Sequence, residues 1–214
     1  MRPKVAVIDY GAGNLRSISR ALEAAGADIV IATTPQSIAE ADGIVLPGVG
    51  HAGASMQRMQ ELGVVEALQS RVRQETPFLG VCLGMQLLFG PQEEGGGEGL
   101  GLLRGRVRSL PTTVKVPQIG WNMARLTTNS PIGAAGTDGD FYFVHSFIAD
   151  DVDPADVAGV TVYGDVFPSI VIRGNIWGTQ FHPEKSSAAG IALLRAWVDL
   201  VSQVAATTSR AVPA

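Results

Sequence analysis

Short apolar runs alternate with helix-like patterns through the first half of the chain. The β-rich apolar runs predict strands within residues 4–9, 28–33, 43–50 and 76–89. Apolar residues at helical spacing predict helices within residues 14–26, 34–40 and 52–75, and a further helix continuing from the strand in 76–89. Strands that alternate with helices are typical of a parallel sheet covered on both faces. The first half is therefore predicted to be α/β.

Local residues mark where several of these elements begin and end. Asn14 is a predicted N-cap and Gly26 a predicted stop for the first helix, whose apolar face carries Leu15, Ile18 and Leu22. Thr34 and Pro35 are a cap followed by a first-turn proline. The helical spacing in 52–75 is interrupted at Gly63, which predicts a break there.

The second half has shorter strand-like runs separated by Gly, Asn, Asp and Pro. These runs predict antiparallel strands in meanders or hairpins within residues 104–110, 123–127, 140–147, 159–164, 168–174 and 175–182. Arg173, Gly174 and Asn175, between the last two runs, predict a hairpin turn. Residues 186–204 predict a closing helix, with Ser186 or Ser187 as its cap.

The chain is expected to form one domain over residues 1–201, followed by a frayed tail at 202–214. Its 214 residues are enough to bury a full core. The segment 93–101 holds so many glycines that a flexible loop is predicted there. The expected fold class is α/β: an open, mostly parallel, flavodoxin-like sheet flanked by helices, with additional antiparallel strands in the second half.

Charge and composition narrow the classes of partner. A formal net charge of -4 and a sequence pI near 5.3 leave no basic excess of the kind that a phosphate backbone requires, so a nucleic-acid partner is not expected. The first residues lack a signal-peptide pattern, and no run approaches the roughly 20 apolar residues of a membrane span. A lone cysteine fits a reducing compartment. We therefore expect a cytoplasmic protein with no membrane partner.

That lone cysteine, Cys82, lies between Gly80 and Gly84 where an apolar run ends. A free cysteine in an apolar run is commonly an inert core residue. The pattern of residues 80–84, however, resembles a nucleophile elbow, in which flanking glycines permit a sharp strand-to-helix turn that exposes the central residue. A thiol at a helix N-terminus favours the thiolate, which is the nucleophilic form. Cys82 is therefore a candidate nucleophile.

A cysteine nucleophile requires a base, and the chain offers His51, His145 and His182. Pro183 biases His182 towards extended backbone, which would place His182 and Glu184 on the same side of a strand end. A nucleophile, a proton-shuttling histidine and a carboxylate that orients it are the parts required for acyl transfer. The alternative without a catalytic role is that residues 182–184 form an ordinary turn with a solvated glutamate.

The tetrahedral intermediate of acyl transfer also needs donors for its negative charge. Residues 46–50 end the third predicted strand with two glycines, where backbone N–H groups can turn towards a ligand. The N–H of Leu83, directly after the nucleophile, is a second candidate donor. An ordinary βα turn is the alternative for residues 46–50.

LPGVG (46–50), GVCLGMQLLF (80–89) and QFHPEKS (180–186), in this order, resemble the class I or triad glutamine amidotransferases. The resemblance implies that Cys82 attacks the side-chain amide of glutamine to form a thioester, that His182 acts as base and acid, and that Glu184 orients it. It also implies that glutamine and its oxyanion are held by Gly48, Val49, Gly50, Leu83, Gln86, His145, Ser146 and Phe147. His51 is expected to be structural.

Four further stretches, 8–18, 115–122, 141–147 and 182–186, are similar to the glutaminase subunits of imidazole glycerol phosphate synthases. In that family ammonia passes to a separate (β/α)₈-barrel cyclase, which makes imidazole glycerol phosphate and an aminoimidazole carboxamide ribotide. The resemblance implies a one-to-one heterodimer, with an interface or coupling face formed by Tyr10, Asn14, Asn122, Tyr142 and Lys185. The family's central motif often reads VPHMGWN, so Gln118 and Ile119 depart from it. That departure concerns signalling to the partner and leaves the triad untouched.

Other functions fit the residues less well. Residues 11–16 lack the last glycine of a dinucleotide-binding fingerprint, and the scattered histidines form no metal-ligand pattern, so neither a cofactor nor a metal is expected. A glutaminase feeding another synthase, such as pyridoxal phosphate synthase, would share the chemistry. A binding or redox-sensing protein that retains a reactive Cys82 is a rival from a different class, and it would not need His182 and Glu184 together.

Overall fold

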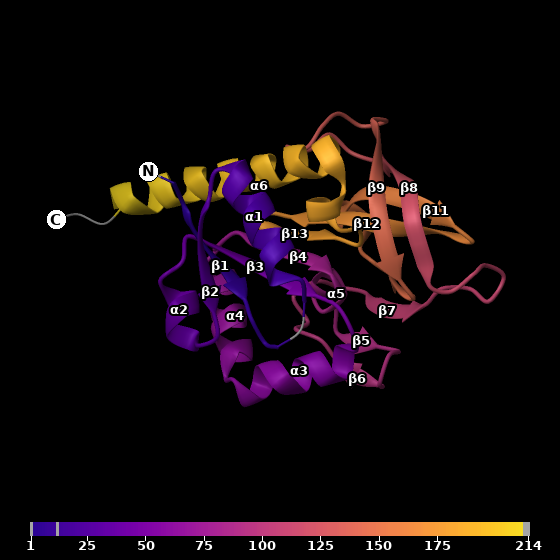
Figure 1. Ribbon diagram of the computed structural model, residues 1–214, viewed down its shortest axis with the longest axis horizontal. Helices are drawn as coiled ribbons and strands as arrows, with labels where there is room; N and C mark the ends of the chain where they lie inside the picture. The colour runs from indigo at the N-terminus through magenta and orange to yellow at the C-terminus, as the bar shows by residue number, and fades with distance from the viewer. Residues whose placement is uncertain (1, 12, 212–214) are drawn as a thin grey trace.

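The computed structural model describes residues 2–11 and 13–211 and has a nine-stranded sheet at its centre (Figure 1). Its strands, in chain order, are β1 Lys4–Ile8, β2 Asp28–Ala32, β3 Gly43–Gly48, β4 Phe78–Cys82, β8 Gln118–Leu126, β9 Asp138–His145, β11 Val157–Tyr163, β12 Asp165–Arg173 and β13 Ile176–Thr179. A four-stranded sheet is made of β5 Pro91–Gln92, β6 Gly97–Glu98, β7 Arg106–Ser109 and β10 Phe147–Asp150. The helices are α1 Leu15–Ala25, α2 Pro35–Ala39, α3 Ala52–Glu61, α4 Val64–Arg73, α5 Leu83–Gln86 and α6 Ser187–Ala211, with short 3₁₀ turns at Pro154–Asp156 and Pro183–Lys185.

The strand order of the large sheet is β2-β1-β3-β4-β13-β12-β11-β8-β9. The first five strands run parallel, and the last four continue the sheet in antiparallel fashion. The parallel part has the flavodoxin-like order, with β13 in the fifth place. The predicted fold class is confirmed, including the antiparallel strands of the second half and the hairpin turn at Gly174.

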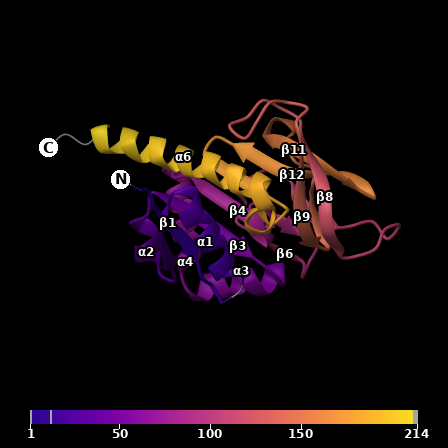
Figure 2. The ribbon, with the colours of Figure 1, turned by 45° about the horizontal axis from the view of Figure 1, so that its top comes forward.

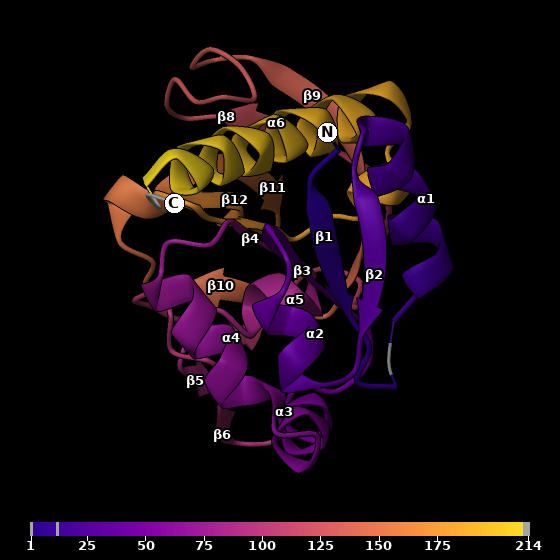
Figure 3. The same cartoon turned by 90° about the vertical axis from the view of Figure 1, so that its left-hand side faces the viewer.

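The side chains of the parallel strands point alternately to the two faces of the sheet, and they form one core on each face. Val5 and Val7 of β1 pack in the core with α1 and α6, whereas Ala6 and Ile8 pack in the core with α3, α4 and α5. Side chains of successive strand residues point to opposite faces, so both faces of a fully apolar strand must be covered. Figure 3 shows α1 and α6 on one side of the parallel strands and α2, α3 and α4 on the other.

The caps predicted for the first helices are confirmed. The side chain of Asn14 accepts the N–H of Ser17, and Gly26 ends α1 with φ 109°, a left-handed conformation that glycine adopts at little cost. Thr34 caps α2 and Pro35 is its first residue. The break at Gly63 separates α3 from α4.

Two predictions about segments are wrong. The predicted flexible loop at 93–101 contains β6, which pairs with β5. The predicted tail at 202–214 is helical as far as Ala211 because α6 continues through it, and residues 212–214 lie outside the described part of the chain. The helix predicted after β4 is confirmed, and it consists of a single turn, Leu83–Gln86.

The expectation that no segment approaches the apolar length of a membrane span is wrong for helix α6. Its segment Ser187–Thr207 is long and apolar enough to cross a membrane by length and composition, with a mean hydropathy of 1.3 in its best window. In Figure 2 the helix lies along the sheet. Trp197 and Val201 are fully buried in the core that α6 shares with α1. These residues pack within the domain, and 33% of the apolar window is buried there.

Candidate active site

Cys82 lies at the carboxyl end of β4, in a backbone conformation that is rare for a side-chain-bearing residue. Its φ of 54° and ψ of −110° make the sharp turn from strand to helix. A Cβ on Gly84 would lie 1.8 Å from the carbonyl oxygen of Leu46, and a Cβ on Gly80 would lie 2.5 Å from the carbonyl oxygen of Gly84. The predicted elbow is confirmed, and its flanking glycines are required by close backbone packing.

The surroundings of the thiol differ from the prediction in one respect. Because α5 has only four residues, no long helix dipole points at Cys82. The Sγ atom instead lies 3.6 Å from the carbonyl oxygen of Val144 and 3.8 Å from Nε2 of Gln180. The polarity at the sulfur comes from these groups and from His182, whose pKa is raised by Cys82.

His182 lies just beyond β13 and is joined to Glu184 as expected. Nδ1 of His182 is 2.9 Å from Oε1 of Glu184, and the two side chains are 5% and 3% exposed. Burial lowers the pKa of His182, but hydrogen bonds and negative charge from Cys82 and Glu184 outweigh it and raise that pKa from 6.5 to about 9. The imidazole is therefore held in its protonated form at neutral pH. The alternative of a solvated turn is wrong.

The triad meets at one edge of the sheet because the strands that carry it are parallel. Cys82 ends β4, His182 follows β13, and β4 and β13 are neighbours that run in the same direction. The loop 48–50 follows β3, which is the other neighbour of β4. The carboxyl ends of the three strands thus form one crevice, which is where open α/β sheets place ligands.

A pocket of about 260 Å³ opens beside Cys82. It contains seven of the eight residues predicted to hold glutamine: Val49, Gly50, Leu83, Gln86, His145, Ser146 and Phe147. The amide of Gln86 is fixed in its wall, because its Nε2 donates to the carbonyl oxygen of Phe147 at 2.9 Å and to Oε1 of Gln180 at 3.1 Å. The space suits a small polar molecule and not a nucleotide.

Gly48 does not line this pocket. A Cβ there would lie 2.8 Å from Cβ of Leu83 and 2.8 Å from the hydroxyl of Tyr10, so the glycine permits β3 to pack against the elbow. Gly50 has a φ of 99°, which only glycine adopts without strain. The loop that could supply oxyanion donors therefore has one glycine required by packing and one by backbone conformation.

His145 has a different environment from His182. Its Nδ1 lies 2.9 Å from the carbonyl oxygen of Phe147, so Nδ1 carries the proton and donates. Burial lowers the pKa of His145 from 6.5 to about 4, so the ring is neutral. It holds the backbone of residues 145–147 in the pocket wall. His51 is structural, as expected: its Nδ1 accepts the N–H of Ala54 at the start of α3.

Four residues of the site were missed by the sequence prediction: Glu94, Pro117, Val144 and Gln180. Oε2 of Glu94 accepts the N–H of Ala52 at 2.7 Å, which joins the β5-β6 turn to α3. The glycine-rich context of Glu94 gave no sign of this contact. Gln180 could have been found, because alternation places it on the same side as His182.

Comparison with known proteins agrees with this geometry. A family model described as glutamine amidotransferase class-I matches residues 6–199. The chain belongs to the class-I glutamine amidotransferases. Among its relatives are proteins named imidazole glycerol phosphate synthase subunit HisH. The one from Symbiobacterium thermophilum is 42% identical over 95% of this chain and 97% of its own, and the one from Halobacterium salinarum is 45% identical over 91% and 92%.

Solved structures show the same fold at lower identity. PurLQS from Thermotoga maritima matches with a TM-score of 0.76 and 20% identity over 94% of this chain and 100% of that chain. A crystal structure of a glutamine amidotransferase matches with a TM-score of 0.73 and 19% identity, over 92% of this chain and 98% of that one. The architecture of this class-I glutamine amidotransferase is thus shared well beyond its sequence relatives.

Three of the five predicted interface residues lie at the surface near the triad. The ring of Tyr142 makes an edge contact with Trp121 at 6.1 Å between centroids, and Nζ of Lys185 lies 5.8 Å from the Tyr142 centroid. Asn14 is exposed and lines a small cavity together with His182 and Glu184. These residues form a surface next to the catalytic crevice.

Tyr10 does not lie at this surface, because its side chain is only 2% exposed. Its hydroxyl donates to the carbonyl oxygen of Pro47 at 3.0 Å, and burial raises the pKa of the phenol to about 12. Tyr10 therefore supports β3 from inside. Asn122 is also separate from the other interface residues. Side chains of successive strand residues point to opposite faces of the sheet, so Asn122 and Trp121 lie on different faces. The side-chain amide of Asn122 donates to the carbonyl oxygen of Val162 on β11.

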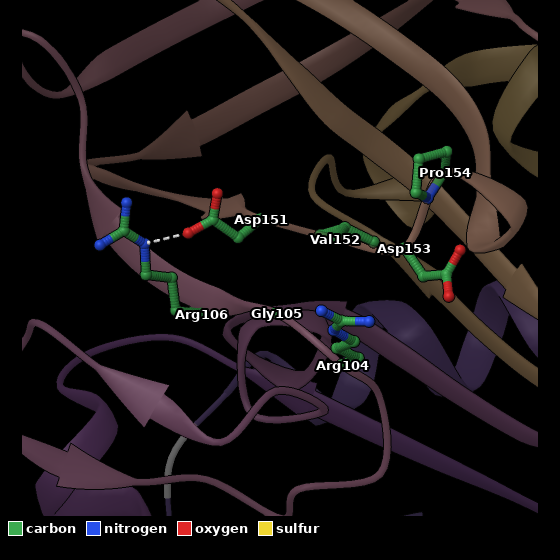
Figure 4. A pocket seen from close by; sticks show the side chains of 7 residues that line it. All are labelled: Arg104, Gly105, Arg106, Asp151, Val152, Asp153 and Pro154. Atoms are coloured by element: carbon green, nitrogen blue, oxygen red, sulfur yellow. Dashed lines mark ion pairs between the residues drawn. The ribbon is translucent and has the colours of Figure 1, made fainter.

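A larger surface hollow of about 640 Å³ lies between Arg104–Arg106 and Asp151–Pro154 (Figure 4). In it the guanidinium of Arg106 pairs with the carboxylate of Asp151 at 3.0 Å. The residues that line it include no cysteine, histidine or hydroxyl nucleophile. The chemistry of this class-I glutamine amidotransferase therefore belongs to the smaller pocket at Cys82.

Proposed function

We propose that the chain is the glutaminase subunit of an imidazole glycerol phosphate synthase, which hydrolyses glutamine to glutamate and ammonia. The observation that carries the chemistry is the buried His182–Glu184 hydrogen bond, with Cys82 close enough to raise the pKa of His182, beside a pocket of amino-acid size. The subgroup is supported by relatives of that name, 41–45% identical over most of their length.

The thiolate of Cys82 attacks the carboxamide carbon of glutamine, and the C=O electron pair moves onto oxygen. The negative charge is met by the backbone N–H of Leu83 and by an N–H of the loop 48–50. The imidazolium of His182 then donates its proton to the departing nitrogen. The C–N bond breaks, ammonia leaves and a thioester remains on Cys82.

Water completes the cycle. His182, now neutral, removes a proton from water as the hydroxide attacks the thioester carbon, and the C–S bond breaks to release glutamate. Glu184 keeps the imidazole in the tautomer that presents its other nitrogen to Cys82. The net reaction converts glutamine and water into glutamate and ammonia.

Ammonia loses its nucleophilicity on protonation in water, so it is best passed directly to a docked acceptor. The relatives are named as subunits of a synthase, which implies a partner subunit. We propose that this partner is a cyclase (β/α)₈ barrel in a one-to-one complex. An exposed apolar surface on β8, β11 and β12 supports a large interface, and its members are Ile119, Trp121, Met123, Val162 and Val166.

This apolar surface is continuous with the mouth of the pocket. Val116 is exposed two residues before β8, and the next residue, Pro117, lines the pocket together with Val49. A partner seated on the surface would cover the route by which ammonia leaves. We expect the chain alone to be nearly inactive and the partner with its ribonucleotide ligand to activate it by completing the oxyanion donors at 48–50.

The rival functions fit less well. A redox sensor would not need Glu184 buried against His182. A glutaminase for another synthase is disfavoured by the names of the relatives.

The test is glutamate release from glutamine by the chain alone, with a cyclase barrel, and with the barrel and its ribonucleotide ligand. A large increase only in the last condition supports the chemistry and the partner together. Activity that does not respond to the barrel would contradict the partner assignment, and no activity under any condition would contradict the enzyme.

A further inference from the structure

Ser186 is fully buried and contacts the catalytic loop without belonging to the triad. Its Oγ donates to the carbonyl oxygen of His182 at 2.6 Å and accepts the backbone N–H of Tyr142 at 3.0 Å. The sequence predicted Ser186 or Ser187 as the cap of α6. Ser186 does stand directly before α6, and its carbonyl oxygen accepts the N–H of Gly190, but its hydroxyl is used between strand β9 and the histidine loop.

The same two residues are joined by a second bond. The N–H of His182 donates to the carbonyl oxygen of Tyr142 at 2.9 Å. A regular antiparallel pair would exchange two N–H to carbonyl bonds. Here the Ser186 hydroxyl is inserted into the second one, so that both backbone polar groups of Tyr142 are tied to the loop that carries His182.

Strand β9 is well placed to serve as the support. It is the edge strand of the large sheet, and one of its sides is free to receive the loop. The same strand presents the carbonyl oxygen of Val144 to the thiol of Cys82 at 3.6 Å. Nucleophile and base are thus positioned against one strand, two residues apart.

The local backbone shows that this placement is imposed by the structure. Ser187 has a φ of 49°, a left-handed conformation that is unfavourable for a residue with a side chain. A Cβ on Gly190 would lie 1.9 Å from the carbonyl oxygen of Pro183 and 2.9 Å from Cβ of Ser186. The first turn of α6 is therefore packed directly against the catalytic loop, and Ser186 has no space to move away.

We infer that Ser186 is a positioning residue for the proposed glutaminase, whose hydroxyl locks the backbone of His182 to strand β9 and so fixes the imidazole between Cys82 and Glu184. It touches neither substrate nor reacting atoms and acts through His182. The predicted change in kcat rests on the proposed function. The predicted effect of Ser186 on the position of the His182 ring does not.

The test compares Ser186→Ala with Ser169→Ala. Ser169 is equally buried, and its hydroxyl bonds Thr161 at 2.8 Å between β11 and β12, so it is a matched control for the loss of a buried hydroxyl. We expect Ser186→Ala to lower kcat about tenfold with KM within about twofold of wild type, and Ser169→Ala to change neither. Glutamate release is measured with the cyclase barrel and its ribonucleotide ligand present.

A second readout does not require turnover. Isotope-labelled histidine gives three side-chain signals in this chain, and their NMR titration reports each ring separately. In wild type we expect His182 to titrate near pH 9 and His145 near pH 4. Ser186→Ala should move the His182 titration towards 6.5 and leave His145 unchanged, and Ser186→Thr, which retains the hydroxyl, should restore the wild-type value.

Unchanged kcat and His182 titration in a folded Ser186→Ala variant would overturn the inference. An equal loss in Ser169→Ala, or no recovery in a folded Ser186→Thr variant, would also overturn it by assigning the effect to general destabilisation or to volume. If wild type releases no glutamate, the proposed function fails, and the His182 titration still decides the role of Ser186.

Discussion

Oε1 of Glu184 lies 2.9 Å from Nδ1 of His182, and both side chains are almost completely buried. A carboxylate in this position fixes the tautomer and favours the protonated ring. The negative charge and polarity of Cys82 act together with Glu184 to raise the pKa of His182.

Glu184→Gln should lower kcat for glutamine hydrolysis by about 10²–10⁴-fold, because the ring loses the group that orients it and stabilises its charge. The pKa of His182 should fall from about 9 towards 6.5. Because the folded pKa is raised, the stabilisation that it reports is fully present below about pH 6.5 and is lost as pH rises through about 9. Urea unfolding at pH 6 and pH 9.5 should therefore show a smaller decrease in stability for the variant than for wild type. Equal decreases would contradict the ion pair.

His145 should make the protein sensitive to acid. Its folded pKa of about 4 lies below the ordinary value of 6.5, so stability is full above pH 6.5 and falls as the pH approaches 4. Protonation would place an unpaired charge among Phe143 and Phe167, whose rings are centred 5.7 and 5.4 Å away. His145→Gln should reduce the loss of unfolding free energy between pH 7 and pH 4.5. Parallel urea curves for both proteins at the two pH values measure it, and an equal loss in both would exclude His145 as the cause.

Gly84→Ala should destabilise the protein by more than about 3 kcal/mol or prevent folding, because its Cβ would lie 1.8 Å from the carbonyl oxygen of Leu46. Gly97→Ala is the control, since no atom lies within 4 Å of its added Cβ. That variant should stay within about 0.5 kcal/mol of wild type. The measurement is the free energy of unfolding in urea. A Gly84→Ala protein as stable as the control would show that the elbow is not closely packed.

Trp121→Asp should weaken binding of the cyclase partner at least tenfold, since a buried interface tryptophan commonly contributes about 2 kcal/mol or more. Ile31→Asp is matched to it: Ile31 is also a half-exposed apolar residue on a sheet strand, but it lies on β2 at the opposite edge of the large sheet. Titration calorimetry with the barrel should show wild-type affinity for Ile31→Asp. If both variants bind as wild type does, the apolar surface on β8, β11 and β12 is not the interface.

The elements with a strong local signal could be predicted from the sequence. Strand β4 and the elbow at Cys82 follow from an apolar run ended by two glycines, and α1 follows from Asn14, its apolar face and Gly26. The extent of α6 could not be predicted, because its last turns, as far as Ala211, carry no glycine or proline stop signal. The small sheet was missed because its strands are short and are defined by their pairing, as at β5 and β6.

Some residues of the site could be predicted from the sequence and others could not. Cys82, His182 and Glu184 are recognisable because their residue types and local spacing are distinctive. The burial of Tyr10 could not be predicted, because a sequence does not show on which side of a strand end an aromatic ring will pack. Glu94 and Ser186 were missed as site residues because their roles depend on contacts with α3 and β9, which are distant in the chain.

The central claim is that Cys82 is the nucleophile for bound glutamine. The most direct measurement is inactivation by a chloroketone analogue of glutamine, followed by mass spectrometry of the cysteine-containing peptide, with and without excess L-glutamine. We predict that Cys82 is alkylated, that glutamine protects it, and that glutaminase activity is lost in proportion to alkylation. Alkylation that glutamine does not slow, or full turnover by a protein whose Cys82 is completely alkylated, would contradict the account.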